Sequence, residues 1–184
     1  VLLEPLTGSV SFAQVVEDLE RQIERLGRSV ILVGHSFGSL YSTALVTRAR
    51  VPIQGWVGMC MCTTAKGWGV FEARSLSLRT PERMAAQNAF FATPTDANFR
   101  SWLKSLAQIY FGAANRELGV KMFDSIPVSA PAFLSVLQSM GPNVFFEGTQ
   151  NLLEFKGKKI LIAGGDDPFF PAEELVAEAA AIGA

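Results

Sequence analysis

Hydrophobic residues occur with two different spacings along the first third of the chain. From Ser11 onward they recur at helical spacing, Ser11 and Gln14 fit a capping box, and Gly27 suits the end of a helix. The continuously apolar run 30–33 comes next and is typical of a parallel strand buried on both faces. The apolar positions of the helical stretch are Phe12, Val15, Val16, Leu19, Ile23 and Leu26. The pattern therefore predicts a helix followed by a short buried strand.

The same alternation continues to about residue 62. A second helix-like stretch covers residues 40–50 and is broken by a proline, and residues 53–62 then have the pattern of another strand. The opening run Val1-Leu2-Leu3 also resembles a buried strand, which suggests that the sequence begins inside a domain. This order of elements favours an α/β fold, a mostly parallel sheet with helices on both faces. We expect residues 1–62 to form the N-terminal part of this core.

The alternation is lost between residues 63 and 148. Successive helical stretches are separated there by breakers such as Thr80-Pro81. We interpret residues 63–148 as a helical insertion, or cap, within the sheet-forming chain. The alternation returns in residues 149–184, where 158–163 predicts a strand and 171–181 a helix that belong to the same core.

Composition limits the classes of partner. The chain has 184 residues, 49% of them hydrophobic, and a formal net charge of −1, which allows one domain with a sizeable core and gives no basic footprint for nucleic acid. No apolar run approaches the ~18 residues that a membrane-spanning helix needs, and no basic-then-apolar leader opens the chain. We therefore expect a cytoplasmic protein with no nucleic-acid partner and no membrane partner.

The two cysteines add little chemistry. Cys60 and Cys62 are two positions apart in a strand-like segment, which places both on one face and makes a local disulfide awkward. They also provide too few ligands for zinc. We interpret them as free, buried thiols in a reducing compartment, and we expect no metal site and no cofactor.

The pentapeptide Gly34-His35-Ser36-Phe37-Gly38 carries the strongest chemical signal, because it follows the first apolar strand and opens a helix. In such a nucleophile elbow the serine stands at the tip of a strained turn, and the flanking glycines let neighbouring elements approach. A glycine-rich turn without chemical function is the alternative. A serine needs an adjacent base to become a nucleophile. The sequence has one histidine, at position 35, and we expect its side chain to point in a different direction from that of Ser36, so we interpret it as a packed residue that shapes the turn.

The order of elements, the motif around Ser36 and the sequence Gly164-Gly165-Asp166-Asp167-Pro168 after the last strand resemble the α/β-hydrolase fold family. The resemblance covers nearly the whole chain and implies the chain order serine, acid, histidine. It assigns Ser36 as the nucleophile. It assigns Asp167 as the acid, because the usual pattern there is glycine, two residues, aspartate and often proline, and Asp166 remains the alternative. Without the serine upstream, both aspartates would be interpreted as a solvated turn with a capping carboxylate.

The resemblance also assigns the remaining parts of the site. It implies that the backbone N–H of Phe37 forms half of an oxyanion hole. The second donor in the family comes from a loop that often carries His-Gly, and nothing similar occurs here, although residues 4–8 resemble the strand end and loop that come next. The family's histidine follows one more strand beyond the helix that begins at Pro171. The chain therefore resembles a fragment, incomplete at both ends, without the catalytic histidine.

These features imply a serine hydrolase that acts on a small-molecule ester, amide or related acyl bond through an acyl-enzyme on Ser36. The capped layout resembles the proline iminopeptidase and esterase branch, and serine disfavours the dehalogenase and epoxide hydrolase branches, which use aspartate. Because the histidine is missing, we expect these 184 residues to be nearly inactive. The alternative is a truncated hydrolase-like protein with a binding or regulatory role. We also expect self-association through uncovered sheet, and the oligomeric state stays open.

Overall fold

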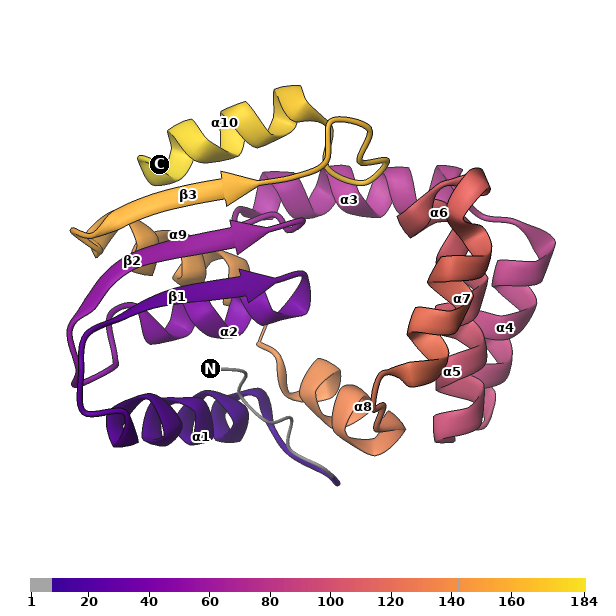
Figure 1. The fold of residues 1–184 in the computed structure, drawn as a ribbon, viewed down its shortest axis with the longest axis horizontal. Coiled ribbons are helices and arrows are strands. Elements are labelled where there is room, and N and C mark those ends of the chain that lie inside the picture. Colours follow the sequence, from indigo (N-terminus) through magenta and orange to yellow (C-terminus); the bar gives the residue numbers. More distant parts are fainter. Residues whose placement is uncertain (1–7, 142) are drawn as a thin grey trace.

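A parallel three-stranded sheet forms the centre of the molecule (Figure 1). The computed structural model describes residues 8–141 and 143–184, so the strand expected at Val1–Leu3 lies outside the described residues. The strands are β1 (Val30–His35), β2 (Ile53–Met59) and β3 (Lys158–Ile162), adjacent in that order. The predicted strands are therefore confirmed, with β2 and β3 ending slightly before the predicted limits.

Four helices pack on one face of the sheet (Figure 1). In the first of them the predicted capping box is present, because Gln14 N–H donates to Ser11 Oγ at 3.2 Å and Ser11 N–H donates to Gln14 Oε1 at 2.8 Å. The four are α1 (Phe12–Arg25), α2 (Phe37–Leu45), α9 (Val144–Glu154) and α10 (Ala172–Ile182). Together with the strands they bury one continuous cluster, formed by Val16, Ile23, Leu32, Leu45, Val46, Trp56, Leu152, Phe155 and Ile182.

The opposite face of the sheet is apolar and exposed in the described structure. Ile31 and Val33 on β1 are 60% and 62% exposed, and Ile160 and Ile162 on β3 are 50% and 45% exposed. The parallel register places these alternate positions on one side, because Val33 pairs with Val57, which in turn pairs with Ile160. The predicted α/β fold with a mostly parallel sheet is thus confirmed. Helices were predicted on both faces of the sheet, and within the residues that the structure describes they cover one face.

The helical insertion predicted for residues 63–148 is a run of short helices between β2 and α9 (Figure 1). Four of them begin after a Ser or Thr whose hydroxyl accepts a backbone N–H three residues later, at Thr64, Thr80, Thr95 and Ser129. The helices are α3 (Ala65–Ser77), α4 (Pro81–Ala92), α5 (Asp96–Ser105), α6 (Ala107–Phe111), η1 (Ala113–Asn115), α7 (Arg116–Ser125) and α8 (Ala130–Ser139). Phe90, Phe99 and Ala130 form a separate buried cluster that joins α4, α5 and α8.

The predicted division after residue 148 falls inside α9. This helix packs closely on α2, because a Cβ added at Gly148 would lie 2.9 Å from Thr43 Oγ1, and Leu152 is fully buried in the core cluster. We therefore propose that the chain re-enters the core at Val144, a few residues before the predicted limit.

Within residues 8–141 and 143–184, no single helix is long and apolar enough to cross a membrane. The bent pair Ala113–Ser125 and Ala130–Ser139 passes the same length and composition criteria when taken together.

Candidate active site

Ser36 lies in the predicted turn between β1 and α2, in a backbone conformation that is rare for a residue with a side chain. Its φ is 50° and its ψ is −125°, a combination that costs on the order of 1–3 kcal/mol and has to be maintained by its surroundings. Two hydrogen bonds fix the turn: Ser36 N–H donates to Met59 O at 2.8 Å, and Ser39 N–H donates to Ser36 O at 2.9 Å. The strained elbow expected from the sequence is present.

The two glycines of the motif differ in their surroundings. A Cβ added at Gly34 would lie 2.5 Å from Ser39 Cα, 2.5 Å from Ser42 Oγ and 2.7 Å from Gly38 O, so only glycine fits where α2 passes over the end of β1. A Cβ added at Gly38 would meet no described atom within 4 Å. Close approach of neighbouring elements, which we expected at both positions, therefore applies to Gly34.

Buried hydroxyl groups hold this elbow from the side of α2. Ser39 Oγ donates to Gly34 O at 2.8 Å, Ser42 Oγ donates to Ser39 O at 2.8 Å, and Trp56 Nε1 donates to Ser42 Oγ at 2.8 Å. Ser39 and Ser42 are buried and Trp56 is inaccessible to solvent. The chain of hydrogen bonds connects the centre of β2 to the residue two positions before Ser36, and buried networks of this kind are rigid when each member is satisfied.

Phe37 is the first residue of α2, and its N–H has no partner within the helix because of that position. No hydrogen bond from this N–H to another described residue is present either. The ring of Phe37 packs against Tyr41 at 5.5 Å and reaches Phe133 of α8 at 6.3 Å, measured between ring centroids. A backbone donor without a partner among the described residues thus lies directly after Ser36, and the side chain of Phe37 connects the elbow to α8.

The structure distinguishes the two candidate acids. Asp166 is exposed, whereas Asp167 is half-buried. Asp167 Oδ1 accepts hydrogen bonds from the N–H groups of Phe169 at 2.9 Å and Phe170 at 3.0 Å, and Asp167 N–H donates to Gly164 O at 3.1 Å. The carboxylate therefore does cap its own turn, and Oδ1 alone receives both bonds.

Ser36, Cys60 and Asp167 follow the ends of three adjacent strands. Ser36 N–H bonds to the last residue of β2, and Cys60 N–H donates to Ile162 O, the last carbonyl of β3, at 2.8 Å. Adjacent strands are about 4.8 Å apart, so the ends of β1 and β3 are separated by about 10 Å. No direct hydrogen bond joins Ser36 to Asp167 in the described structure.

Cys60 occupies the middle of this row and was not expected there. Like Ser36 it has a φ of 50°, and it is half-buried rather than buried. Burial raises the pKa of the Cys60 thiol, the charge of Asp167 raises it further, and the backbone of Gly164 acts in the opposite direction. The thiol therefore lies beside the candidate acid. In the sequence, the signal for this placement is that Cys60 directly follows β2, the strand that lies between β1 and β3.

His35, the single histidine, belongs to β1 and is exposed. It alternates in register with Ile31 and Val33 on the open face of the sheet, and among the described residues it makes no hydrogen bond with Ser36 or Asp167. The expectation that it is a packed residue is therefore wrong, because its side chain lies on the exposed face of the sheet, and the interpretation that it is not the base stays a prediction. The described residues also contain no group of three or more His, Cys, Asp or Glu side chains that could hold a metal ion.

Aromatic residues of the cap contact the acid-bearing turn. Phe169 packs against Phe71 of α3 at 5.4 Å and against Tyr110 of α6 at 5.6 Å, and Phe170 stacks on Phe71 at 5.6 Å. Desolvation raises the pKa of the Tyr110 hydroxyl, with a further contribution from Asp167 and an opposing one from Arg83. Helices of the segment 63–148 thus contact the residues next to Ser36 and Asp167, namely Phe37 and Phe169.

Comparisons with known proteins concern the fold and the family of this chain. No curated protein sequence matches the chain. Solved structures with the same fold include a thermophilic esterase from Thermogutta terrifontis (17% identity, 97% of this chain and 62% of that chain, TM-score 0.62). They also include a homoserine O-acetyltransferase from Staphylococcus aureus (15% identity, 97% and 56%, TM-score 0.55) and a haloalkane dehalogenase variant from Bradyrhizobium elkanii (16% identity, 97% and 65%, TM-score 0.53).

These likenesses cover nearly all of this chain, while the chain spans 56% to 65% of the length of those three proteins. At such low identity they show the fold alone. The sequence matches the family described as the alpha/beta hydrolase family over residues 4–184. The chain belongs to the alpha/beta hydrolase family.

Proposed function

We propose that this chain carries the nucleophile and the acid of a serine hydrolase that cleaves a small-molecule ester, amide or related acyl bond. The observation that supports this most strongly is the conformation of Ser36, with a φ of 50° and a ψ of −125°. Such strain has no use in a purely structural turn, and the buried bonds through Ser39 and Ser42 maintain it. Serine at this position also separates the chain from the dehalogenase branch, although the fold is shared.

In the proposed reaction Ser36 Oγ attacks the carbonyl carbon of the substrate, and its proton passes to a base. The negative oxygen of the tetrahedral intermediate accepts a hydrogen bond from Phe37 N–H, which is free at the start of α2. The carbon–leaving group bond then breaks, the leaving group takes the proton from the base, and an acyl-enzyme on Ser36 remains. A water molecule, activated by the same base, hydrolyses this ester and restores the serine.

The proposed base is a histidine oriented by Asp167, placed in the interval of about 10 Å between the ends of β1 and β3. His35 is exposed on the sheet and does not occupy that position. We therefore assign the base to a residue that these 184 residues do not contain. A triad that lacks one member retains about 10³–10⁴-fold acceleration over water, so the 184 residues alone should turn over slowly.

The test is covalent labelling of Ser36 by a fluorophosphonate, with and without added imidazole as an external base. We expect slow labelling of Ser36, identified by peptide mass, and a faster rate when imidazole is supplied. Ser36→Ala should abolish the adduct, whereas Ser101→Ala, an exposed serine on α5, should leave it unchanged. Labelling that persists in Ser36→Ala, or that falls on other serines at the same rate, would contradict the proposal.

A second candidate is a binding or regulatory protein without turnover. The observation that favours it is that no base stands beside Ser36 among the described residues. In that case imidazole should not accelerate labelling, and Ser36→Ala should bind a partner as the unchanged chain does. We also propose a reducing, cytoplasmic setting, because Cys60 and Cys62 are free thiols.

A further inference from the structure

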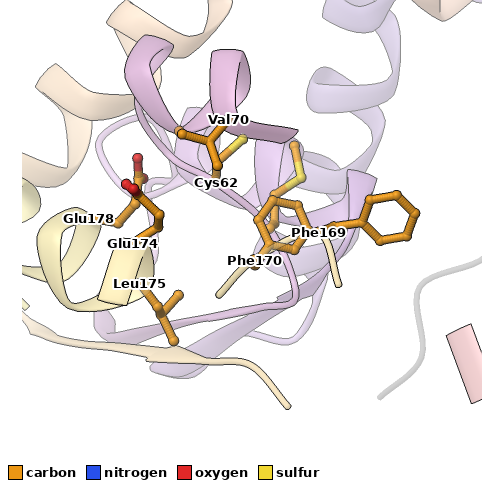
Figure 2. Close-up of a pocket in the computed structure, with 9 residues that line it drawn as sticks. Cys62, Val70, Phe169, Phe170, Glu174, Leu175 and Glu178 are labelled. Atoms are coloured by element: carbon orange, nitrogen blue, oxygen red, sulfur yellow. The ribbon is translucent and has the colours of Figure 1, made fainter. Parts of the chain in front are cut away.

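Glu178 on α10 is a buried carboxylate that the proposed reaction does not use. It is 6% exposed, and no Lys, Arg or His among the described residues forms an ion pair with it. Figure 2 shows its side chain directed from α10 toward the segment that carries Cys62. Burying a charge is costly, and an apolar side chain of similar size is often as stable or more stable at such a place. Its presence therefore calls for an explanation other than stability.

Among the residues that the structure describes, two consecutive ones provide all the hydrogen bonds to this carboxylate. Thr63 N–H and Thr63 Oγ1 each donate to Glu178 Oε2 at 2.7 Å, and Thr64 N–H donates to the same oxygen at 3.0 Å. Thr64 Oγ1 donates to Glu178 Oε1. Thr64 is also the N-cap of α3, so the negative charge lies at the positive end of the first cap helix.

Thr63 is also held by α9, the helix that follows the cap in sequence. Thr149 Oγ1 of α9 donates to Thr63 O at 2.6 Å. The place where the chain leaves the core for the cap is therefore fixed by α9 and α10, the two helices that follow the cap in sequence. We name Thr63, Thr64 and Glu178 the cap junction.

The cap junction is closely packed and leaves no space for a ligand. The cavity beside it has a volume of about 10 Å³, room for one water molecule at most. A Cβ at Gly67 would overlap the Glu178 carboxylate. Burial and the charge of Glu178 raise the pKa of Cys62 to about 12, which agrees with a thiol enclosed beside a carboxylate.

The helix that carries Glu178 begins directly after the acid-bearing turn. α10 starts at Ala172, and the residues between Asp167 and α10 include Phe169 and Phe170, which pack on Phe71 of α3. α3 is thus attached to the acid-bearing segment at its N-terminus by the carboxylate and along its length by aromatic rings. Both attachments join α3, with the two residues before it, to the segment 167–182.

We infer that Glu178 is a positioning residue, which fixes the first cap helix against the acid-bearing segment so that the cap and Asp167 keep one relative placement over the site. The role of Asp167 itself rests on the proposed function. The first experiment is therefore independent of activity.

Amide hydrogen exchange of the 184-residue chain provides that experiment. Glu178→Leu removes the acceptor of all four donors, and we expect the Thr63 and Thr64 amides to lose at least about tenfold in protection while β1 and β2 keep theirs. Glu178→Gln retains one acceptor oxygen and should recover part of the protection. Glu174→Leu, one turn earlier on α10, is the matched control: it removes an ion pair with the exposed Lys66 of α3 at 3.6 Å, which joins the same two helices but should contribute little.

Unchanged protection at Thr63 and Thr64 in Glu178→Leu would overturn the inference, and so would an equal loss in the strands, because that is a general loss of stability. If Glu178→Leu does not fold, Thr63→Val removes one donor that bonds to Glu178 and Thr63→Ser keeps it. Thr63→Val should then reduce protection at Thr64, and equal behaviour of the two variants would overturn the inference.

A second readout separates positioning from stability. Ser36 is labelled by a small and by a bulky fluorophosphonate, and the ratio of the two rates is compared. A displaced cap should change this ratio in Glu178→Leu and not in Glu174→Leu, whereas a merely structural role would lower both rates equally and overturn the inference. Absence of any Ser36 labelling would instead count against the proposed function and leave the exchange result as the test of Glu178.

Discussion

The side-chain hydrogen bonds that support the turn carrying Ser36 come from distant buried residues, whereas the hydrogen bonds of the turn carrying Asp167 come from its own segment. Behind Ser36, three hydrogen bonds run from Trp56 through Ser42 and Ser39 to Gly34. At the acid-bearing turn, both carboxylate bonds and the backbone bond to Gly164 lie within the segment 164–170. The strained turn receives hydrogen bonds from distant elements, whereas distant elements reach the Asp167 turn through the aromatic contacts of Phe169 and Phe170. Substitutions should therefore be more costly on the serine side.

Gly34→Ala should show the largest effect. The added Cβ would lie 2.5 Å from Ser39 Cα and 2.5 Å from Ser42 Oγ, and backbone at that distance can move away only by shifting α2. We expect the free energy of unfolding to fall by about 3 kcal/mol, measured by urea denaturation.

Gly165→Ala is the matched control on the acid side, because a Cβ there would meet no described atom within 4 Å. Its effect should stay within about 0.5 kcal/mol. Equal losses in the two variants would show that the two turns do not differ in their packing.

Ser42→Ala should have the next largest effect. It removes the acceptor of Trp56 Nε1 and leaves a fully buried N–H without a partner. We expect a loss of about 2 kcal/mol in the free energy of unfolding, against almost none for Ser101→Ala on the exposed face of α5. If the Ser42→Ala loss is the same in a Trp56→Phe background, the two side chains are not coupled and the network does not act as a unit.

On the acid side, Asp167→Ala should cost about 1 kcal/mol, since the N–H groups of Phe169 and Phe170 lose their acceptor. Asp167→Asn keeps a carbonyl oxygen in the same place, so its effect on the free energy of unfolding should be less than half of that. Asp166→Ala, at an exposed position, serves as the control. If Asp167→Asn is as costly as Asp167→Ala, the charge itself stabilises the turn.

The sequence was sufficient to predict the features that depend on local pattern. The helix that begins after Ser11, the strands around Val30 and Ile53, and the strained turn at Ser36 follow from spacing and from glycine positions. The family resemblance was sufficient to place Asp167 at the same end of the sheet as Ser36.

Contacts between distant segments could not be predicted in this way. The bond from Trp56 to Ser42 and the bonds from Thr63 to Glu178 join residues that neither periodicity nor a motif relates. Gly34 and Gly38 are equivalent in the motif, and only the position of α2 shows that one is enclosed and the other faces open space. The place of Cys60 beside Asp167 likewise depends on the order of the strands.

The smallest predicted effect concerns the reactivity of Cys60. Burial is the main cause of its raised pKa, and the negative charge of Asp167 is the second. Asp167→Asn removes that charge and should lower the pKa, so a larger fraction of the thiol is ionised at pH 8. Because the thiolate is the form that reacts, alkylation of Cys60 by iodoacetamide should become about threefold faster. Peptide mass spectrometry measures this rate.

Cys62, with its pKa raised to about 12 and its side chain buried, should stay unmodified in the same samples, and Asp166→Asn should change the Cys60 rate little. A Cys60 alkylation rate that is unchanged or slower in Asp167→Asn would show that the Asp167 carboxylate and the Cys60 thiol are not electrostatically coupled.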